Sequence, residues 1–185
     1  MIVPQQEFVF NFEKGSFVQE WPGEDGTTFL PKKIIVYSPT LRQRSYIEPL
    51  KKEISNGVRL LRKDLFEMYN TMKDSIEKEN ESKQTKSYGE KEEVEPSKEM
   101  DLRETARTLL IHPDVDVTVI YDSILGLLFD GQNMRKAKLE GAGGTSAKLL
   151  SGQSQTFESA INESEFERFV VEYLNAFFPS LLQVI

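Results

Sequence analysis

The residue types that carry most enzyme chemistry are scarce in this sequence. It contains no cysteine and a single histidine, His112, so thiolate catalysis, disulfide bonds and cysteine-ligated zinc or iron–sulfur sites are excluded. A Ser-His-Asp triad or a multi-histidine metal site would depend on His112 alone. His112 precedes Pro113 at the expected end of a helix, where an imidazole can satisfy terminal carbonyl groups. We therefore predict a structural role for it and expect neither a cofactor nor a metal.

Carboxylates are more frequent, but their spacing does not assemble a site. Asp114, Asp116, Asp122 and Asp130 could bind a hard cation such as Mg²⁺. Asp114 and Asp116 do not share a helix face, and the other two lie further along the chain, so the first two fit better as helix caps. One enzymatic alternative stays open, a small acid/base hydrolase that uses Asp122 and Glu172.

Features that could bind anions are also incomplete. Gly141–Gly144 followed by Lys148 suggests a phosphate loop, but alanine precedes that lysine and leucine follows it, where glycine and Ser or Thr are required. The chain has 185 residues and a net charge of −7, which disfavours nucleic acid as a partner. Acidic residues also interrupt its basic cluster, which predicts a solvated helix face with ion pairs. That cluster comprises Arg42, Arg44, Lys51, Lys52, Arg59, Arg62 and Lys63.

The elements that would position these side chains begin with a small β unit. Phenylalanines alternate along residues 7–13, a Lys-Gly turn follows, and residues 16–21 form a second extended run. Residues 32–37 are rich in β-branched and aromatic side chains, as a third strand would be. The sequence thus predicts a three-stranded antiparallel sheet with an aromatic face that a helix must cover.

A long amphipathic helix follows directly and could provide that cover. Ser45 and Glu48 have the spacing of a capping box. Apolar residues then recur at steps of three and four as far as Ile76, which predicts a helix about 45 Å long. Gly57 would be its weak point, because glycine disfavours helix interiors. The apolar stripe resembles a coiled-coil seam and needs a facing helix from this chain or from another.

Three shorter helices are expected in the second half of the chain. The first runs from Ser97 to about Ile111, and the second occupies residues 114–129 with a broad apolar face. The third opens with capping-box spacing at Ser164 and Glu167 and ends before a proline. The last of these helices carries a stripe of aromatic residues.

Composition divides the chain into three parts. Residues 1–76 hold the sheet and the long helix, and residues 101–185 hold the shorter helices and a Gly/Ser-rich loop over 131–162. Between them, residues 77–100 are polar and charged, which predicts a mobile connector or a frayed helical extension. The expected fold class is α+β, with a small N-terminal antiparallel sheet packed on a mainly α-helical bundle.

Two stretches resemble the tail and baseplate assembly chaperones of tailed bacteriophages. In Ile34 to Ile47 (IIVYSPTLRQRSYI) a β segment passes through a Pro-Thr turn into a basic helix start. In Asp114 to Phe129 (DVDVTVIYDSILGLLF) an acidic cap opens an apolar helix. The resemblance implies a small, acidic, mainly helical, non-enzymatic protein that holds an aggregation-prone tail component until assembly.

The apolar residues of the long helix and of the C-terminal tail indicate protein binding independently of that resemblance. Exposed apolar patches usually mark interaction sites, and we expect the apolar segment Leu-Leu-Gln-Val-Ile to dock on the core of the protein or on a partner. We expect helix packing in a groove or seam, against another protein or a second copy. The expected contact residues are Leu61, Leu65, Met68, Met72, Phe177, Phe178, Leu181 and Leu182.

The remaining alternative is a structural virion subunit of a baseplate or connector, whose segments order on assembly. The N-terminal residues lack the pattern of a secretory leader, and the longest apolar run, residues 124–129, is far shorter than a bilayer requires. We therefore expect a cytoplasmic protein, in the host cytoplasm if viral, with no membrane partner.

Overall fold

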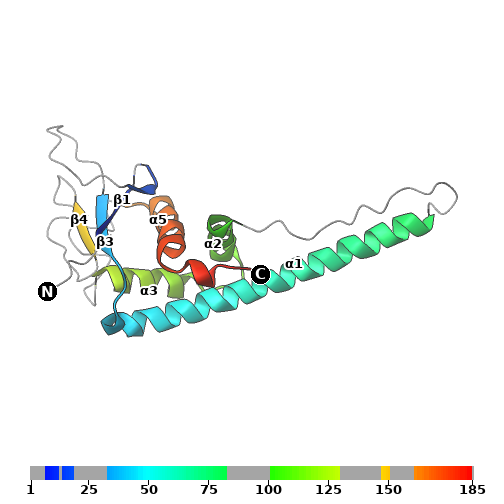
Figure 1. The fold of residues 1–185 in the computed structure, drawn as a ribbon, viewed down its shortest axis with the longest axis horizontal. Helices are drawn as coiled ribbons and strands as arrows, with labels where there is room; N and C mark the ends of the chain where they lie inside the picture. The colour runs from blue at the N-terminus through cyan, green and yellow to red at the C-terminus, as the bar shows by residue number, and fades with distance from the viewer. Residues whose placement is uncertain are drawn as a thin grey trace.

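The protein folds into a head of sheet and helices from which one long helix projects (Figure 1). The computed structural model describes residues 7–12, 14–18, 33–82, 101–129, 147–150 and 161–184. The architecture is mainly helical α+β with a small antiparallel sheet, as predicted. Its elements are β1 (Glu7–Asn11), β2 (Ser16–Val18), β3 (Lys33–Tyr37), the 3₁₀ helix η1 (Leu41–Gln43), α1 (Arg44–Ser82), α2 (Leu102–Ile111), α3 (Val117–Phe129), β4 (Ala147–Leu150), α5 (Glu163–Phe177) and the 3₁₀ helix η2 (Pro179–Leu181).

The sheet has the strand order β2-β1-β3-β4, and each neighbouring pair is antiparallel. Phe10 of β1 pairs with Phe17 of β2 and with Ile34 of β3, which confirms the three predicted strands. The β1–β2 turn contains Gly15 at φ +65°, a conformation that favours glycine. Strand β4 was not predicted, because it falls in the range assigned to the Gly/Ser-rich loop. It pairs along β3 and satisfies backbone groups of that edge.

Helix α5, and not the long helix, packs on the aromatic face of the sheet. The ring of Phe10 meets that of Phe169 at 5.0 Å between centroids, and Phe8 meets Phe177 at 5.2 Å, both edge to face. The expectation that the long helix would cover this face was therefore wrong. Helix α1 packs instead along α3, which is buried over most of its length because nearly all of its side chains are apolar.

Three helices begin at other residues than their sequence signals predicted. The chain enters α1 through η1, where the Thr40 N–H donates to Gln43 Oε1 at 3.0 Å, and Glu48 pairs with Arg44 inside the helix. At α5 the capping box is formed by Asn162 and Glu165, two residues before the predicted pair. Helix α2 follows Asp101, whereas Ser97 lies outside the described residues.

Asp116 caps α3, as predicted, whereas Asp114 does not. Asp116 Oδ1 accepts hydrogen bonds from the backbone N–H groups of Thr118, at 3.1 Å, and Val119, at 3.4 Å. Asp114 takes part through its backbone, whose N–H donates to Nδ1 of His112 at 3.1 Å. None of the described helices is long and apolar enough to cross a membrane.

Candidate protein-binding site on the long helix

Helix α1 changes its surroundings abruptly after Leu61. Up to that point its apolar residues are buried in the head, where Leu50 and Ile54 are fully covered and Val58 and Leu61 nearly so. Every residue over 62–81 is exposed. We name residues 62–82 the arm, a stretch of helix about 30 Å long that extends past the head in Figure 1.

The arm carries a stripe of large apolar side chains on one side. Steps of three and four residues return to the same side of a helix, so these side chains continue the line that is buried inside the head. Their exposed fractions include 38% for Leu65 and 57% for Met72. Phe66 lies at one flank of the line and is 65% exposed. We name the arm stripe the residues Leu65, Met68, Tyr69, Met72 and Ile76.

Apart from Phe66, the rest of the arm is polar and is stabilised by contacts within the helix itself. Lys63 and Glu67 form an i,i+4 ion pair at 3.7 Å, and Thr71 Oγ1 donates to the carbonyl oxygen of Glu67. Such pairs contribute only about 0.2–0.5 kcal/mol each to a helix. Most helical stability in proteins comes from packing of the apolar face, so the arm lacks within the described residues the contact that its sequence is suited to make.

The root of the arm, in contrast, is held on two sides. Arg62 donates from Nε to the carbonyl oxygen of Val184 at 2.8 Å and from Nη2 to that of Gln183 at 2.9 Å. On the other side His112 Nε2 lies 3.0 Å from Asp64 Oδ2. Because Nδ1 of His112 accepts a hydrogen bond from a backbone N–H, the ring hydrogen lies on Nε2, which donates a hydrogen bond to Asp64. The His112 ring thus links the end of α2 to α1, through a backbone N–H and a carboxylate and not through the terminal carbonyl groups that we expected it to satisfy.

The structure divides the predicted contact residues into two groups. Leu65, Met68 and Met72 lie on the exposed arm stripe. The others belong to the head: Leu61, Phe178 and Leu182 are buried, while Phe177 and Leu181 are half-buried and packed on the core. The C-terminal tail therefore docks on its own molecule, because η2 packs against α1 and Arg62 binds its carbonyl oxygens.

Sequence reasoning missed Phe66 and Tyr69 as exposed candidates and did not include Ile76 in the contact set. The available signal was the same periodicity that placed Leu65 and Met72, since Tyr69 and Ile76 each stand four residues beyond one of these two. Periodicity alone does not show at which residue the head stops covering the helix.

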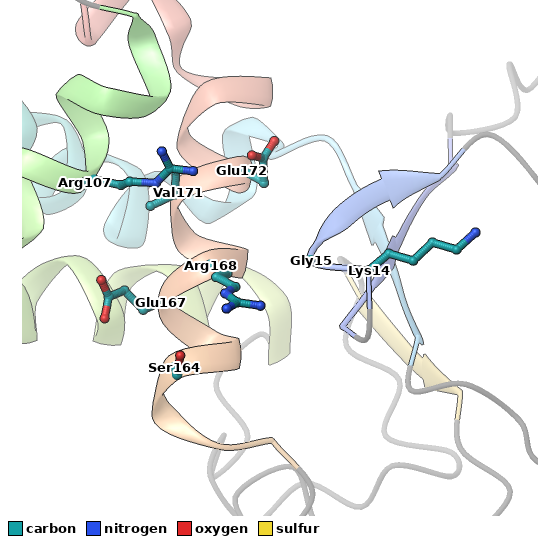
Figure 2. Close-up of a pocket in the computed structure, with 8 residues that line it drawn as sticks. All are labelled: Lys14, Gly15, Arg107, Ser164, Glu167, Arg168, Val171 and Glu172. Atoms are coloured by element: carbon teal, nitrogen blue, oxygen red, sulfur yellow. The ribbon is translucent and has the colours of Figure 1, made fainter.

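A pocket of about 400 Å³ opens between the β1–β2 turn and helices α2 and α5. Its charged side chains do not converge, since Figure 2 shows Glu167 and Arg168 leaving α5 on opposite sides and Lys14 extending away from that helix. Glu172 also lines this pocket but binds Arg103 at 2.7 Å, a contact that raises the pKa of Arg103. Asp122 is exposed on α3 and is not among the lining residues, so the pocket does not unite the two proposed hydrolase carboxylates.

The other candidate sites are the predicted metal ligands, the glycine cluster and a second pocket. Among the described residues, no three His, Asp or Glu side chains gather as metal ligands would. Asp130 and Gly141–Gly144 lie outside these residues, and Lys148 falls in β4. A second pocket of about 400 Å³ is lined mainly by apolar residues, among them Phe8, Ile47 and Phe177, and Lys51 also lines it.

Comparisons of the chain with protein-family models, with curated proteins and with solved structures found no match. Function is therefore inferred from the residues and contacts of this chain. Within the described residues, six of the eight exposed large hydrophobic side chains lie on the arm, which an ordinary solvated helix face would not show.

Proposed function

We propose that this protein is a non-enzymatic binding factor whose arm docks on a helical surface of another polypeptide. One observation carries the proposal: the apolar line of α1 is buried as far as Leu61 and continues, uncovered, from Leu65 to Ile76. Removing apolar surface from water is worth about 25 cal/mol per Å². Side chains of the same kind as those that hold α1 in the head are thus available for a second contact outside it.

The chemistry of the stripe suits a helix partner. Side chains at steps of three and four interdigitate with an apolar groove or a facing helix, as in helix-in-groove recognition. Met68 and Met72 are unbranched and polarisable, so they can fill partner surfaces of irregular shape. Binding would also stabilise the helix of the arm, because the apolar face would then be packed.

Within this class, the narrower proposal is an assembly chaperone for a tail or baseplate component of a tailed bacteriophage. It rests on the resemblance of residues 34–47 and 114–129. These two stretches pack on each other in the head: Gln43 Nε2 donates to the carbonyl oxygen of Leu127 at 2.8 Å, and the Tyr46 ring lies against Gly126. The resembling residues therefore belong to one structural unit and not to two separate regions.

The binding proposal is tested by affinity capture from native lysate with three forms of the protein. Met72→Glu places a charge in the arm stripe, and Asn70→Glu places the same charge on the opposite side of the exposed arm. We expect proteins identified by mass spectrometry to be retained by the wild type and by Asn70→Glu and lost from Met72→Glu. Equal retention by Met72→Glu would refute the arm as the binding surface.

The chaperone proposal needs a separate measurement, because a structural subunit would present the same arm. An assembly chaperone leaves the particle, so we expect the protein to be absent from purified virions of the phage that encodes it and present in lysates before assembly. Stoichiometric presence in purified virions would instead identify a structural subunit.

A further inference from the structure

The position of the head limits what can lie on the arm stripe. The stripe continues the buried line of α1, so it lies on the same side of the helix as α2, α3 and η2 (Figure 1). A second α1 laid along it in the parallel direction would need its own head where the first head already stands. In the antiparallel direction the second helix enters from the tip, and its head lies at the tip of the first arm, away from the first head.

The stripe also has a spacing that reads the same in both directions. Leu65, Tyr69, Met72 and Ile76 are separated by steps of four, three and four residues. A two-fold axis between residues 70 and 71 therefore places Leu65 opposite Ile76 of a second copy and Tyr69 opposite Met72 of that copy. Antiparallel two-fold pairing requires self-complementarity of this kind, in which residue i meets j and j meets i.

The flanks of the stripe agree with this pairing at its centre. At 100° per residue, Lys73 and Phe66 lie on the same flank, and antiparallel pairing brings like flanks together. Lys73 of each copy then lies beside Phe66 of the other, an arrangement that allows cation–π attraction. One like-charge approach remains at the ends, between Asp64 and Glu79 of the other copy, and Asp64 already binds His112.

The available area is sufficient for a reversible dimer. The five residues of the arm stripe and Phe66 are between 38% and 65% exposed. Large side chains of this kind present on the order of 200 Å² each when fully exposed, which gives roughly 500 Å² per copy and ~1,000 Å² for the pair. Specific interfaces begin near that size.

We propose that the arm stripe is occupied by the arm of a second copy of this chain, antiparallel and two-fold symmetric, before any other partner binds. The inference rests on the proposed function, since it takes the arm to be a binding surface. A foreign helix would then have to displace the second copy, because both use the same side chains. The other occupant that the chain itself could supply is residues 83–100, which connect α1 to α2.

Sedimentation of the full-length protein tests the pairing. We expect a concentration-dependent monomer–dimer equilibrium for the wild type and for Asn70→Glu. Met72→Glu should raise the dissociation constant roughly tenfold or more, because two symmetry-related charges enter one seam. A wild type that stays monomeric at the highest soluble concentration, as cover by residues 83–100 would produce, overturns the proposal. A dimer indifferent to Met72→Glu overturns it as well.

Cross-linking tests the direction, because the chain has no native cysteine to interfere. Under oxidation, Leu65→Cys mixed with Ile76→Cys should give a mixed disulfide dimer, while either variant alone gives little. Strong self-cross-linking of both single variants would show a parallel pair and refute the proposed geometry.

The failures of the two proposals can be told apart. Capture of a partner that depends on Met72 by a wild type that never dimerises would leave the proposed function standing and remove only the self-pairing. A dimer with the predicted cross-links, combined with capture that is unaffected by Met72→Glu, would remove the proposed binding surface and leave the self-pairing.

Discussion

Two helix glycines determine how closely other elements of the head approach their helices. A Cβ atom at Gly126 would lie 2.2 Å from the Tyr46 ring, and one at Gly57 would lie 2.9 Å from Leu109. Gly57 is the residue that helix propensity marks as the weak point of the long helix. In the structure the missing side chain is what admits Leu109 and Val115 against α1. A conformational cost in the helix is thereby exchanged for closer packing of the head.

Gly126→Ala should lower the free energy of unfolding by about 2–3 kcal/mol, because the added methyl group overlaps the ring of Tyr46. Gly57→Ala should cost less, since its overlap is smaller and alanine favours the helix by about 1 kcal/mol. Chemical denaturation of both variants measures the order. Gly126→Ala in a Tyr46→Ala background should show most of its penalty removed, and an undiminished penalty there would contradict the assigned clash.

Stability at alkaline pH should depend on Tyr173. Its side chain is almost fully buried in the core, and burial raises the pKa of its phenol. A raised pKa means that the folded state holds the proton more tightly than the unfolded chain. The contribution of this proton is therefore complete below the ordinary tyrosine value of about 10 and is lost as the pH rises above it.

Tyr173→Phe should flatten the decline of the unfolding free energy above pH 10, as measured by denaturant titrations at successive pH values. Tyr69→Phe, on the exposed arm, controls for removal of a phenol. An alkaline slope equally steep in Tyr173→Phe and in the wild type would show that another group governs it.

At the scale of elements, the sequence predicted which segments form and was less accurate about where they begin. Apolar periodicity gave all four described α-helices and three of the four described strands, because each pattern reports one buried face. The first residues of helices were predicted less accurately. At α5, for example, Asn162 and Ser164 both stand three residues before a glutamate. Local spacing satisfies two capping boxes there, and packing of the helix selects one of them.

The candidate site was predicted only in part for a similar reason. Leu61 and Leu65 occupy equivalent positions in the repeat, yet one is buried and the other is exposed. The head ends between them, where the tail reaches α1 from residues more than a hundred positions away, as the bonds from Arg62 to Gln183 and Val184 show. Long-range contacts of this kind leave no trace in local periodicity.

Leu182 is the side chain that tests this docking of the tail. It is fully buried, so Leu182→Ala should lower the free energy of unfolding by about 2–4 kcal/mol through lost burial and a residual cavity. Gln183→Ala, whose side chain is exposed, is the matched control and should be nearly neutral because Arg62 binds its backbone carbonyl oxygen. Thermal and chemical denaturation give both values. A neutral Leu182→Ala would mean that the tail is not part of the core.

At the scale of the whole molecule, one helix contributes to two parts of the protein, the core of the head and the exposed arm. The first half of α1 is part of the core of the head, and the second half presents the same kind of side chains to a partner. The ion pair between Arg103 and Glu172 joins α2 to α5 and does not involve the arm. Binding at the arm can therefore be altered by substitutions that leave the core of the head intact.

Because α1 is a single helix of 39 residues, the number of residues beyond the head fixes both how far the arm reaches and which way its apolar side faces. Adding seven residues beyond Leu61 would lengthen the reach by about 10 Å and turn the apolar side by only about 20°, whereas adding two would rotate it by about 200°. Insertions of a whole heptad would thus be tolerated at the cost of distance, while an insertion of two residues would turn the apolar side away from whatever the arm holds.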